Sequence, residues 1–174
     1  IENFSSTEND FYYYTDKNQS DVIVRKKEIY DGAVPAGNSV MAFNLFYLSI
    51  IYDNQEWKQQ AVTLLNNLSE LITKYPTSFG NWATLLIDVY ADINEIAICG
   101  NEFEKLRDEL LQYFIPNKVI QCTNNPNENN YPLIAQKVIS SQPMIYLCRN
   151  YTCKSPVNNV SSIVNEIVNS AKFK

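Results

Sequence analysis

The sequence contains no histidine among its 174 residues. Histidine is the usual general base of Ser–His–Asp and Cys–His sites, and it supplies two ligands of the HExxH zinc site. None of these arrangements can be assembled from this chain alone. The groups left to carry chemistry are carboxylates and thiols.

Long apolar runs and an excess of positive charge are also missing. No apolar run reaches the roughly 18 residues that a membrane-spanning helix needs, and the formal net charge is -5. The longest basic run, Arg25–Lys27, is followed at once by Glu28. We therefore expect a cytoplasmic protein whose partners are neither nucleic acid nor membrane. The first residue, Ile1, and the absence of a signal-peptide pattern predict a chain processed or trimmed from a longer one.

Glycine is scarce, with four residues in all. A strand–glycine–helix junction at Gly100 could hold a phosphate, but it has one glycine instead of a glycine-rich loop. Glu102 and Glu104 follow in the first helical turn, where acidic groups would repel an anion. No cofactor is expected, nucleotides included.

The residues that are present predict a mixed α and β protein in two parts. Hydrophobic residues make up 45% of the chain, as in ordinary globular proteins. Residues 1–92 are expected to form a β-hairpin and three helices, and residues 93–174 a small α/β unit with a largely parallel sheet. The first part is expected to hold a hairpin over 11–30 and helices over 40–52, 54–74 and 77–90, with Asn54 capping the second helix and Thr77 or Ser78 the third.

The helix over 40–52 is apolar on nearly all sides, which is typical of a helix buried on most sides. Three helices that include such a member cannot bury their own surface. We therefore expect neighbours from a missing N-terminal part of the same protein. Without them, exposed helix faces favour self-association into a homo-oligomer.

The second part begins with a strand–helix–strand pattern, which predicts a parallel pair joined by a right-handed crossover. A polar loop over 123–130 and a short helix over 132–139 should follow. The expected strands cover 95–100, 118–122 and 144–148, and the expected helices of this pattern and of the carboxyl end cover 102–114 and 160–171.

Two carboxylates, Glu28 and Asp31, stand three residues apart before a loop rich in glycine and proline. Paired carboxylates can act as acid and base on a glycosidic bond, so both are candidate catalytic residues. Lys27, Asn38 and Trp82 are the candidate substrate-binding residues for a small carbohydrate. The alternative is that Glu28 and Asp31 satisfy loop amides and lysines, and that Trp82 belongs to the core.

The second candidate site is the pair Cys148 and Cys153, with Arg149 and Lys154 between and beside them. A nearby cation can lower the pKa of a thiol and make it reactive. Three alternatives stay open: structural thiols, a redox-active pair, and a metal site, although the other two cysteines lack paired spacing. Cysteines that end apolar runs fit a reducing compartment better than a disulfide scaffold.

Four segments, in this order and spacing, carry a resemblance to a known family: 24–39, Tyr75-Pro76, Pro116-Asn117-Lys118 and Cys148-Arg149-Asn150-Tyr151-x-Cys153-x-x-Pro156. Over about 24–156 they resemble the C-terminal part of the YyaL / spermatogenesis-associated protein 20 family. The first and last of these motifs are specific, and the middle two are weak. Ala36 departs from the serine usual in the family, so a hydroxyl role is absent there.

The resemblance implies an N-terminal thioredoxin-like domain and a six-hairpin (α/α) toroid similar to that of glycosidases and epimerases. The three helices would be the last part of that toroid, with the α/β unit appended. Three functions follow as hypotheses: a structural or interaction module, a carbohydrate-active toroid portion, and a redox-linked client-binding region. Fold analogy alone supports the second.

Overall fold

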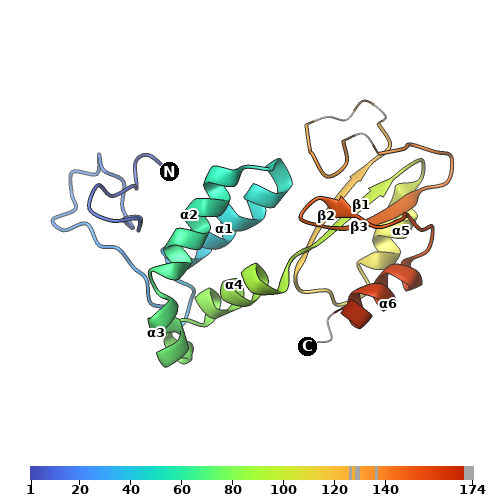
Figure 1. Cartoon of the computed structure of the whole chain (residues 1–174). Helices are drawn as coiled ribbons and strands as arrows, with labels where there is room; N and C mark the ends of the chain where they lie inside the picture. The colour runs from blue at the N-terminus through green and yellow to red at the C-terminus, as the bar shows by residue number, and fades with distance from the viewer. Residues whose placement is uncertain (126, 128–129, 136, 171–174) are drawn as a thin grey trace. The chain divides into compact units, whose positions relative to one another are not determined.

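The computed structural model describes residues 1–125, 127, 130–135 and 137–170. The chain forms two compact units, one made of residues 1–50 and 54–91 and the other of residues 51–53 and 92–174. The first unit is helical and the second contains a four-stranded sheet (Figure 1). The prediction of a mixed α and β protein is confirmed.

The hairpin predicted over 11–30 is not formed, because the structure gives these residues no strand. One backbone hydrogen bond joins the two halves, from Tyr14 N to Lys26 O at 2.8 Å. A two-stranded hairpin without a third strand is marginally stable. The segment is held instead by side chains, such as Arg25, which donates to Thr15 O and Asn3 O.

Helix α1 (Gly37–Tyr52) matches the predicted apolar helix, and Asn54 caps α2 (Gln55–Asn66) as predicted, accepting from Trp57 N at 3.0 Å. The single helix predicted over 54–74 is wrong. It is divided into α2 and α3 (Ser69–Lys74), with Leu68 outside the helical region between them. The break follows two asparagines, which favour helix ends over helix interiors.

Helix α4 (Gly80–Ala91) follows a short 3-10 turn, η1 (Pro76–Ser78), which interrupts the helix predicted from residue 77. Neither Thr77 nor Ser78 caps α4. Its first amides donate instead to Asp31, which lies far away in the sequence. The core of this unit consists of apolar side chains from all four helices and the loops. The largest fully buried ones are Trp82, Phe79, Leu64, Leu65 and Leu85.

The sheet of the second unit has the order β2-β1-β3-β4. Strand β1 (Asn94–Cys99), helix α5 (Phe103–Leu110) and strand β2 (Lys118–Thr123) form the predicted unit with a parallel pair. Strand β3 (Met144–Arg149) is antiparallel to β1 and to β4 (Thr152–Cys153). The sheet is therefore mixed, and the prediction of a largely parallel sheet is wrong.

The direction of β3 follows from its connection to β2. A parallel strand would need a crossover from one end of the sheet to the other. The chain instead returns from β2 at the same end, where Met144 pairs with Cys99. Residues 132–135 form turns, whereas a helix was predicted over 132–139, and residue 136 of that range lies outside the described residues.

The two sheet faces carry different clusters. Ile96, Ile98, Ile145 and Leu147 pack with α5 and with α6 (Val160–Ser170). The other face carries Ala97, Cys99, Tyr146 and Cys148 against Leu133 and Ile134. Among the described residues, no helix has the length and apolar character required to cross a membrane.

Candidate functional site

Asp31 joins the amino-terminal ends of two helices. Its Oδ1 accepts from Ala36 N at 2.9 Å and from the Ser39 hydroxyl at 2.7 Å, at the start of α1. Its Oδ2 accepts from Asn81 N at 2.9 Å and Trp82 N at 3.3 Å, at the start of α4. Helix amino termini expose unpaired amides and favour negative charge, so one carboxylate stabilises both ends.

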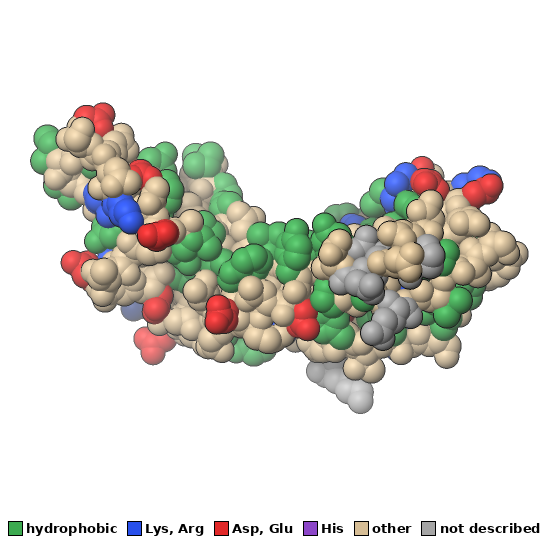
Figure 2. Space-filling view, turned by 90° about the horizontal axis from the view of Figure 1, so that it is seen from above, with side chains coloured by type: hydrophobic (Ala, Val, Ile, Leu, Met, Phe, Trp, Pro, Cys, Tyr) green, Lys and Arg blue, Asp and Glu red, His purple; other side chains and the backbone are tan. Residues whose placement is uncertain are grey.

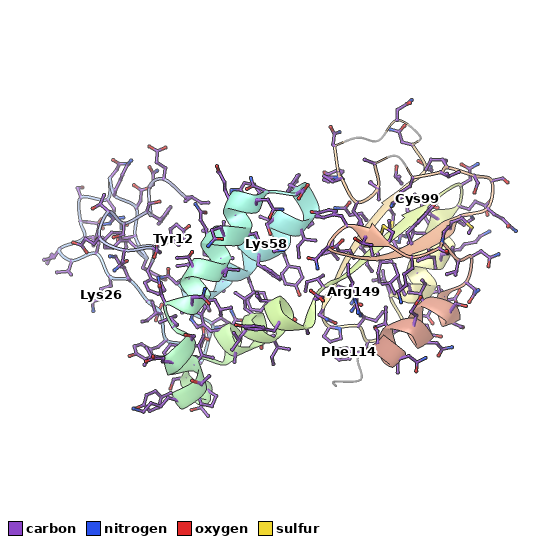
Figure 3. The ribbon with its side chains drawn as sticks, viewed as in Figure 1. Tyr12, Lys26, Lys58, Cys99, Phe114 and Arg149 are labelled. Carbon is purple, nitrogen blue, oxygen red and sulfur yellow. A yellow bond between two sulfur atoms is a disulfide. The ribbon has the colours of Figure 1, made fainter. Side chains whose placement is uncertain are left out.

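Asn38 connects the irregular segment, residues 11–30, to α1 and is only 3% exposed. Its side-chain oxygen accepts from Tyr12 N at 2.7 Å. Its amide nitrogen donates to Tyr12 O at 2.9 Å and to Glu28 O at 2.8 Å. Both N–H groups and the oxygen of this amide are therefore hydrogen-bonded, which fixes the position of residues 12–28 against the helix. Tyr12 is labelled in Figure 3.

Trp82 is fully buried, and its indole N–H donates to Ile29 O at 2.8 Å. The ring of Phe11 meets it edge-on at 6.4 Å between centroids. The structure thus places Trp82 in the core, beside the irregular segment over 11–30 that Asn38 holds in place. Together Asp31, Asn38 and Trp82 form what we call the loop clamp.

Lys27 and Glu28 lie outside the loop clamp. The Lys27 ammonium donates to Glu8 and Asn9 and lies 4.6 Å from the centre of the Tyr13 ring. The Glu28 side chain is exposed and lines an open hollow of the irregular segment. The five candidates are therefore not gathered at one cavity. The catalytic assignment of Glu28 and Asp31 stays a prediction.

Tyr47 on α1 and Asp88 on α4 form a second polar contact between helices, with the Tyr47 hydroxyl donating to Asp88 at 2.8 Å. Burial raises the pKa of Asp88, and the hydrogen bond from Tyr47 partly opposes that rise. Burial and the neighbouring Asp88 raise the pKa of Tyr47. Sequence reasoning missed this pair, because an aspartate within an apolar helical stripe gives no sign of its partner.

In the sheet unit, Cys148 and Cys153 form a disulfide between β3 and β4, where they are direct cross-strand partners. In this disulfide-bonded state the two cysteines are neither free structural thiols nor ligands of a shared metal. The described residues contain no group of histidine, cysteine, aspartate or glutamate able to hold a metal ion. Lys137 donates to Cys153 Sγ at 3.1 Å.

The two basic residues that the sequence placed near this pair are engaged elsewhere. Arg149, at the end of β3 and labelled in Figure 3, donates to Asn94 and Ser170. The Lys154 ammonium pairs with Glu166. The cation that contacts a sulfur is Lys137, which sequence reasoning missed because it lies in an irregular connection.

Glu95 is 3% exposed and is the β1 residue paired with Cys148. Its carboxylate accepts from Asn150 N and Tyr151 N, both at 3.0 Å. These two residues have positive φ and form the two-residue turn between β3 and β4. Such turns are the ones that suit the twist of a hairpin, and the carboxylate fixes this one beside the disulfide.

Cys99 and Cys122 are free thiols. Cys99 belongs to the cluster on one sheet face and Cys122 packs with the cluster on the other. Burial raises the pKa of each to about 11, and the proximity of Cys122 adds to the rise for Cys99. Both therefore stay protonated and poorly nucleophilic near neutral pH.

Comparison with known proteins finds relatives that match most of the chain. The chain is 28% identical over 149 residues to spermatogenesis-associated protein 20 of Rattus norvegicus, and 29% identical over 145 residues to that of Homo sapiens. These alignments cover 80% and 78% of the chain. The chain is similar in sequence to spermatogenesis-associated protein 20. An uncharacterized protein of Caenorhabditis elegans is 23% identical over 158 residues, covering 87% of the chain.

The match to spermatogenesis-associated protein 20 covers 19% of the rat protein and 18% of the human one, so the chain spans about a fifth of the length of these relatives. The alignment to the Caenorhabditis elegans protein covers 22% of that protein. No family model matches the sequence. No solved structure matches it.

Proposed function

We propose that this chain is a structural packing module of a longer helical protein, in which α1 and α4 lie against helices outside the present sequence. The observation that carries the proposal is the outer face of α1, which is uncharged and presents large apolar side chains although it is exposed. The finer architecture proposed is that of the family resemblance: the last helices of an (α/α) toroid.

Helix α1 contains no charged residue along its length. Its inward side carries buried residues such as Ala42, Leu45 and Phe46. Its outward side presents Val40, which is 42% exposed, and Leu48, which is 40% exposed, with the uncharged Asn44 between them. A helix apolar on both sides is typical of one that is surrounded by protein.

Helix α4 repeats this pattern. Its one charged residue, Asp88, is buried and bonded to Tyr47. Its exposed positions include Ile87 and Tyr90, which are 59% and 79% exposed. Hydrophobic side chains are visible over the helical unit in Figure 2. Contiguous apolar surface of this kind marks a site of protein contact.

Helix α2 provides the contrast within the same unit. Its outer side carries Glu56, Gln59 and Gln60, all exposed, while Ala61, Leu64 and Leu65 are buried. This is the ordinary amphipathic pattern of a helix facing water. The uncharged faces of α1 and α4 are therefore specific to those helices.

The occupant proposed for these faces is a set of helices from the rest of a longer protein of this family. The chain accounts for about a fifth of its relatives' length, so ample sequence exists to supply them. The loop clamp supports this role, because Asp31 fixes the starts of both α1 and α4 and so sets the surface that they present.

The carbohydrate-active alternative gains no specific support from the described contacts. Asp31 is occupied by four donors and Trp82 is buried in the core. Glu28 remains exposed, but the other described residues that line its hollow include no carboxylate. We therefore propose a structural role for the motif over 27–39.

The test is the association of the chain as a function of concentration, measured by light scattering at micromolar protein. Without the occupant, the apolar faces should meet one another and the apparent mass should rise with concentration. The double variant Leu48→Lys with Ile87→Lys should stay monomeric, because charges cannot be buried unpaired. Gln60→Lys on α2 is the matched control and should associate like the unmodified chain.

A monomer that binds no hydrophobic dye would contradict the proposal, since its faces would then already be covered within the chain. A discrete and stable dimer would identify a second copy as the occupant and would overturn the assignment to further helices of the longer protein. Equal association of the double variant and the control would show that other surfaces are responsible.

A further inference from the structure

We propose that the Cys148–Cys153 disulfide is a thiol–disulfide exchange site for a partner dithiol, with Cys153 as the reacting sulfur and Lys137 as the residue that stabilises its thiolate. The inference does not depend on the packing role of α1 and α4, because all of these residues belong to the sheet unit.

The two sulfurs differ in access. Cys148 is 1% exposed and lies on β3, an inner strand of the sheet. Cys153 is half-buried and lies on β4, at the sheet edge. An incoming thiolate can therefore approach Cys153, whereas Cys148 is shielded. This asymmetry assigns Cys153 as the exchanging sulfur and Cys148 as the resolving one.

Lys137 gives the site its electrostatic feature. Its ammonium lies 3.1 Å from Cys153 Sγ and 4.9 Å from the centre of the Tyr146 ring, which holds it over the sheet face. Among the ion pairs of the described residues, none includes Lys137. A cation beside a sulfur stabilises the thiolate form, which is the form that attacks and leaves.

Exchange with a partner dithiol proceeds in two steps. A partner thiolate attacks Cys153 Sγ, and the electron pair of the Cys148–Cys153 bond goes to Cys148 Sγ, which takes up a proton. The second partner thiolate attacks the partner sulfur of this mixed disulfide, and Cys153 leaves as a thiolate held by Lys137. The partner dithiol is oxidised to a disulfide, and the Cys148–Cys153 pair is reduced to a Cys148 thiol and a Cys153 thiolate.

The surrounding hairpin keeps the reduced pair ready to re-form. Glu95 fixes the turn through Asn150 and Tyr151, independently of the sulfur–sulfur bond. Backbone pairing of Arg149 with Thr152 continues the register on which Cys148 and Cys153 face each other. The reverse reaction, oxidation by a partner disulfide, therefore needs no rearrangement of the strands.

The experiment uses the full chain and a disulfide reagent, 5,5′-dithiobis(2-nitrobenzoic acid). Cys148→Ser leaves Cys153 to react, and Cys153→Ser leaves Cys148. At pH 7 the Cys148→Ser chain should react at least about 10-fold faster than the Cys153→Ser chain. Cys99 and Cys122 are common to both and set the slow background.

Lys137 is tested in the Cys148→Ser chain. Lys137→Met should lower the thiolate absorbance at pH 7 and slow the reaction about 10-fold, whereas Lys137→Arg should retain most of both. Lys154→Met is the control, since that lysine pairs with Glu166, and it should leave both unchanged. A purely structural role for Lys137 would not alter the thiolate absorbance.

Wild-type protein provides a measurement that needs no variant. Partial reduction with dithiothreitol, acid quenching and mass spectrometry should find the mixed disulfide on Cys153. Equal reaction of the two single-cysteine chains, a mixed disulfide mainly on Cys148, or undiminished thiolate absorbance in Lys137→Met would each overturn the inference.

Discussion

The carboxylate of Asp31 accepts from the backbone amide of Asn81 at 2.9 Å, across 50 positions of sequence. The same carboxylate accepts from the Ser39 hydroxyl on α1. A residue that sequence reasoning places beside Glu28 as a catalytic candidate thus holds the starts of two helices together. The position of Ala36 fits this role, because it contributes its backbone amide and needs no hydroxyl.

Replacing Asp31 should destabilise the helical unit. Asp31→Ala leaves the amides at both helix starts without their acceptor, so we expect a loss of about 2–4 kcal/mol in the free energy of unfolding. Asp31→Asn keeps one acceptor oxygen and should lose about half as much. Tryptophan fluorescence during urea unfolding measures this, because both tryptophans, Trp57 and Trp82, lie in the helical unit. Asp21→Ala, at an exposed aspartate, is the control, and an equal loss there would refute the role of Asp31.

Asn38→Asp tests the polarity of the second member of the loop clamp. The change preserves shape but replaces the amide donor that faces the carbonyls of Tyr12 and Glu28 with a carboxylate oxygen, which cannot donate. We expect a loss of about 2–4 kcal/mol, because the unpaired groups are buried. Asn44→Asp, on the exposed side of α1, is the control and should change stability by less than about 0.5 kcal/mol. Similar losses at both positions would mean that any new charge on α1 is harmful.

Asp88 should make the free energy of unfolding depend on pH, in a direction that its raised pKa defines. Its pKa is raised in the folded state, so the folded protein binds this proton more tightly than the unfolded chain. The group therefore contributes stability below its unfolded pKa of about 3.9, and the contribution is lost as pH rises through the folded value. Asn in its place can still accept from Tyr47 but does not titrate.

The free energy of unfolding of the wild type should therefore fall relative to that of Asp88→Asn as pH rises above about 4. Urea titrations at a series of pH values, followed by tryptophan fluorescence, measure the difference. A difference that is constant with pH, or that favours the wild type increasingly toward neutral pH, would contradict the raised pKa.

Gly100 should not tolerate a side chain. Its φ is 133°, and an added Cβ would lie 2.7 Å from Pro143 Cα, which is backbone and cannot move aside. We expect Gly100→Ala to destabilise the sheet unit by at least about 2 kcal/mol, measured by hydrogen exchange of the β1 amides. Gly32→Ala is the matched control, since its Cβ would meet nothing within 4 Å. Unchanged exchange in Gly100→Ala would show that the turn is built differently.

Local patterns predicted much of the fold. The apolar run of α1, the Asn54 cap and the strand–helix–strand pattern from Asn94 to Thr123 each depend on neighbours in sequence, and the structure contains them. The hairpin over 11–30 failed because aromatic strand-prone residues need a third strand, which this unit does not provide. The direction of β3 depended on a connection with no clear periodicity.

The candidate sites were predictable to a smaller extent. The motif over 27–39 was correctly singled out, but the partners of Asp31 lie on a distant helix, and spacing alone cannot reveal them. The cysteine pair was likewise found. Its cationic neighbour was assigned to Arg149 or Lys154 by proximity in sequence, whereas the fold brings Lys137 to the sulfur.

The most direct measurement of the packing role is reconstitution with the occupant that it requires. The human relative, with its 145-residue matching segment removed, is mixed with this chain and analysed by size-exclusion chromatography with light scattering. We expect a one-to-one complex with the unmodified chain and with Gln60→Lys, and none with the chain carrying Leu48→Lys and Ile87→Lys. Failure of the unmodified chain to bind, or equal binding by the charged double variant, would contradict it.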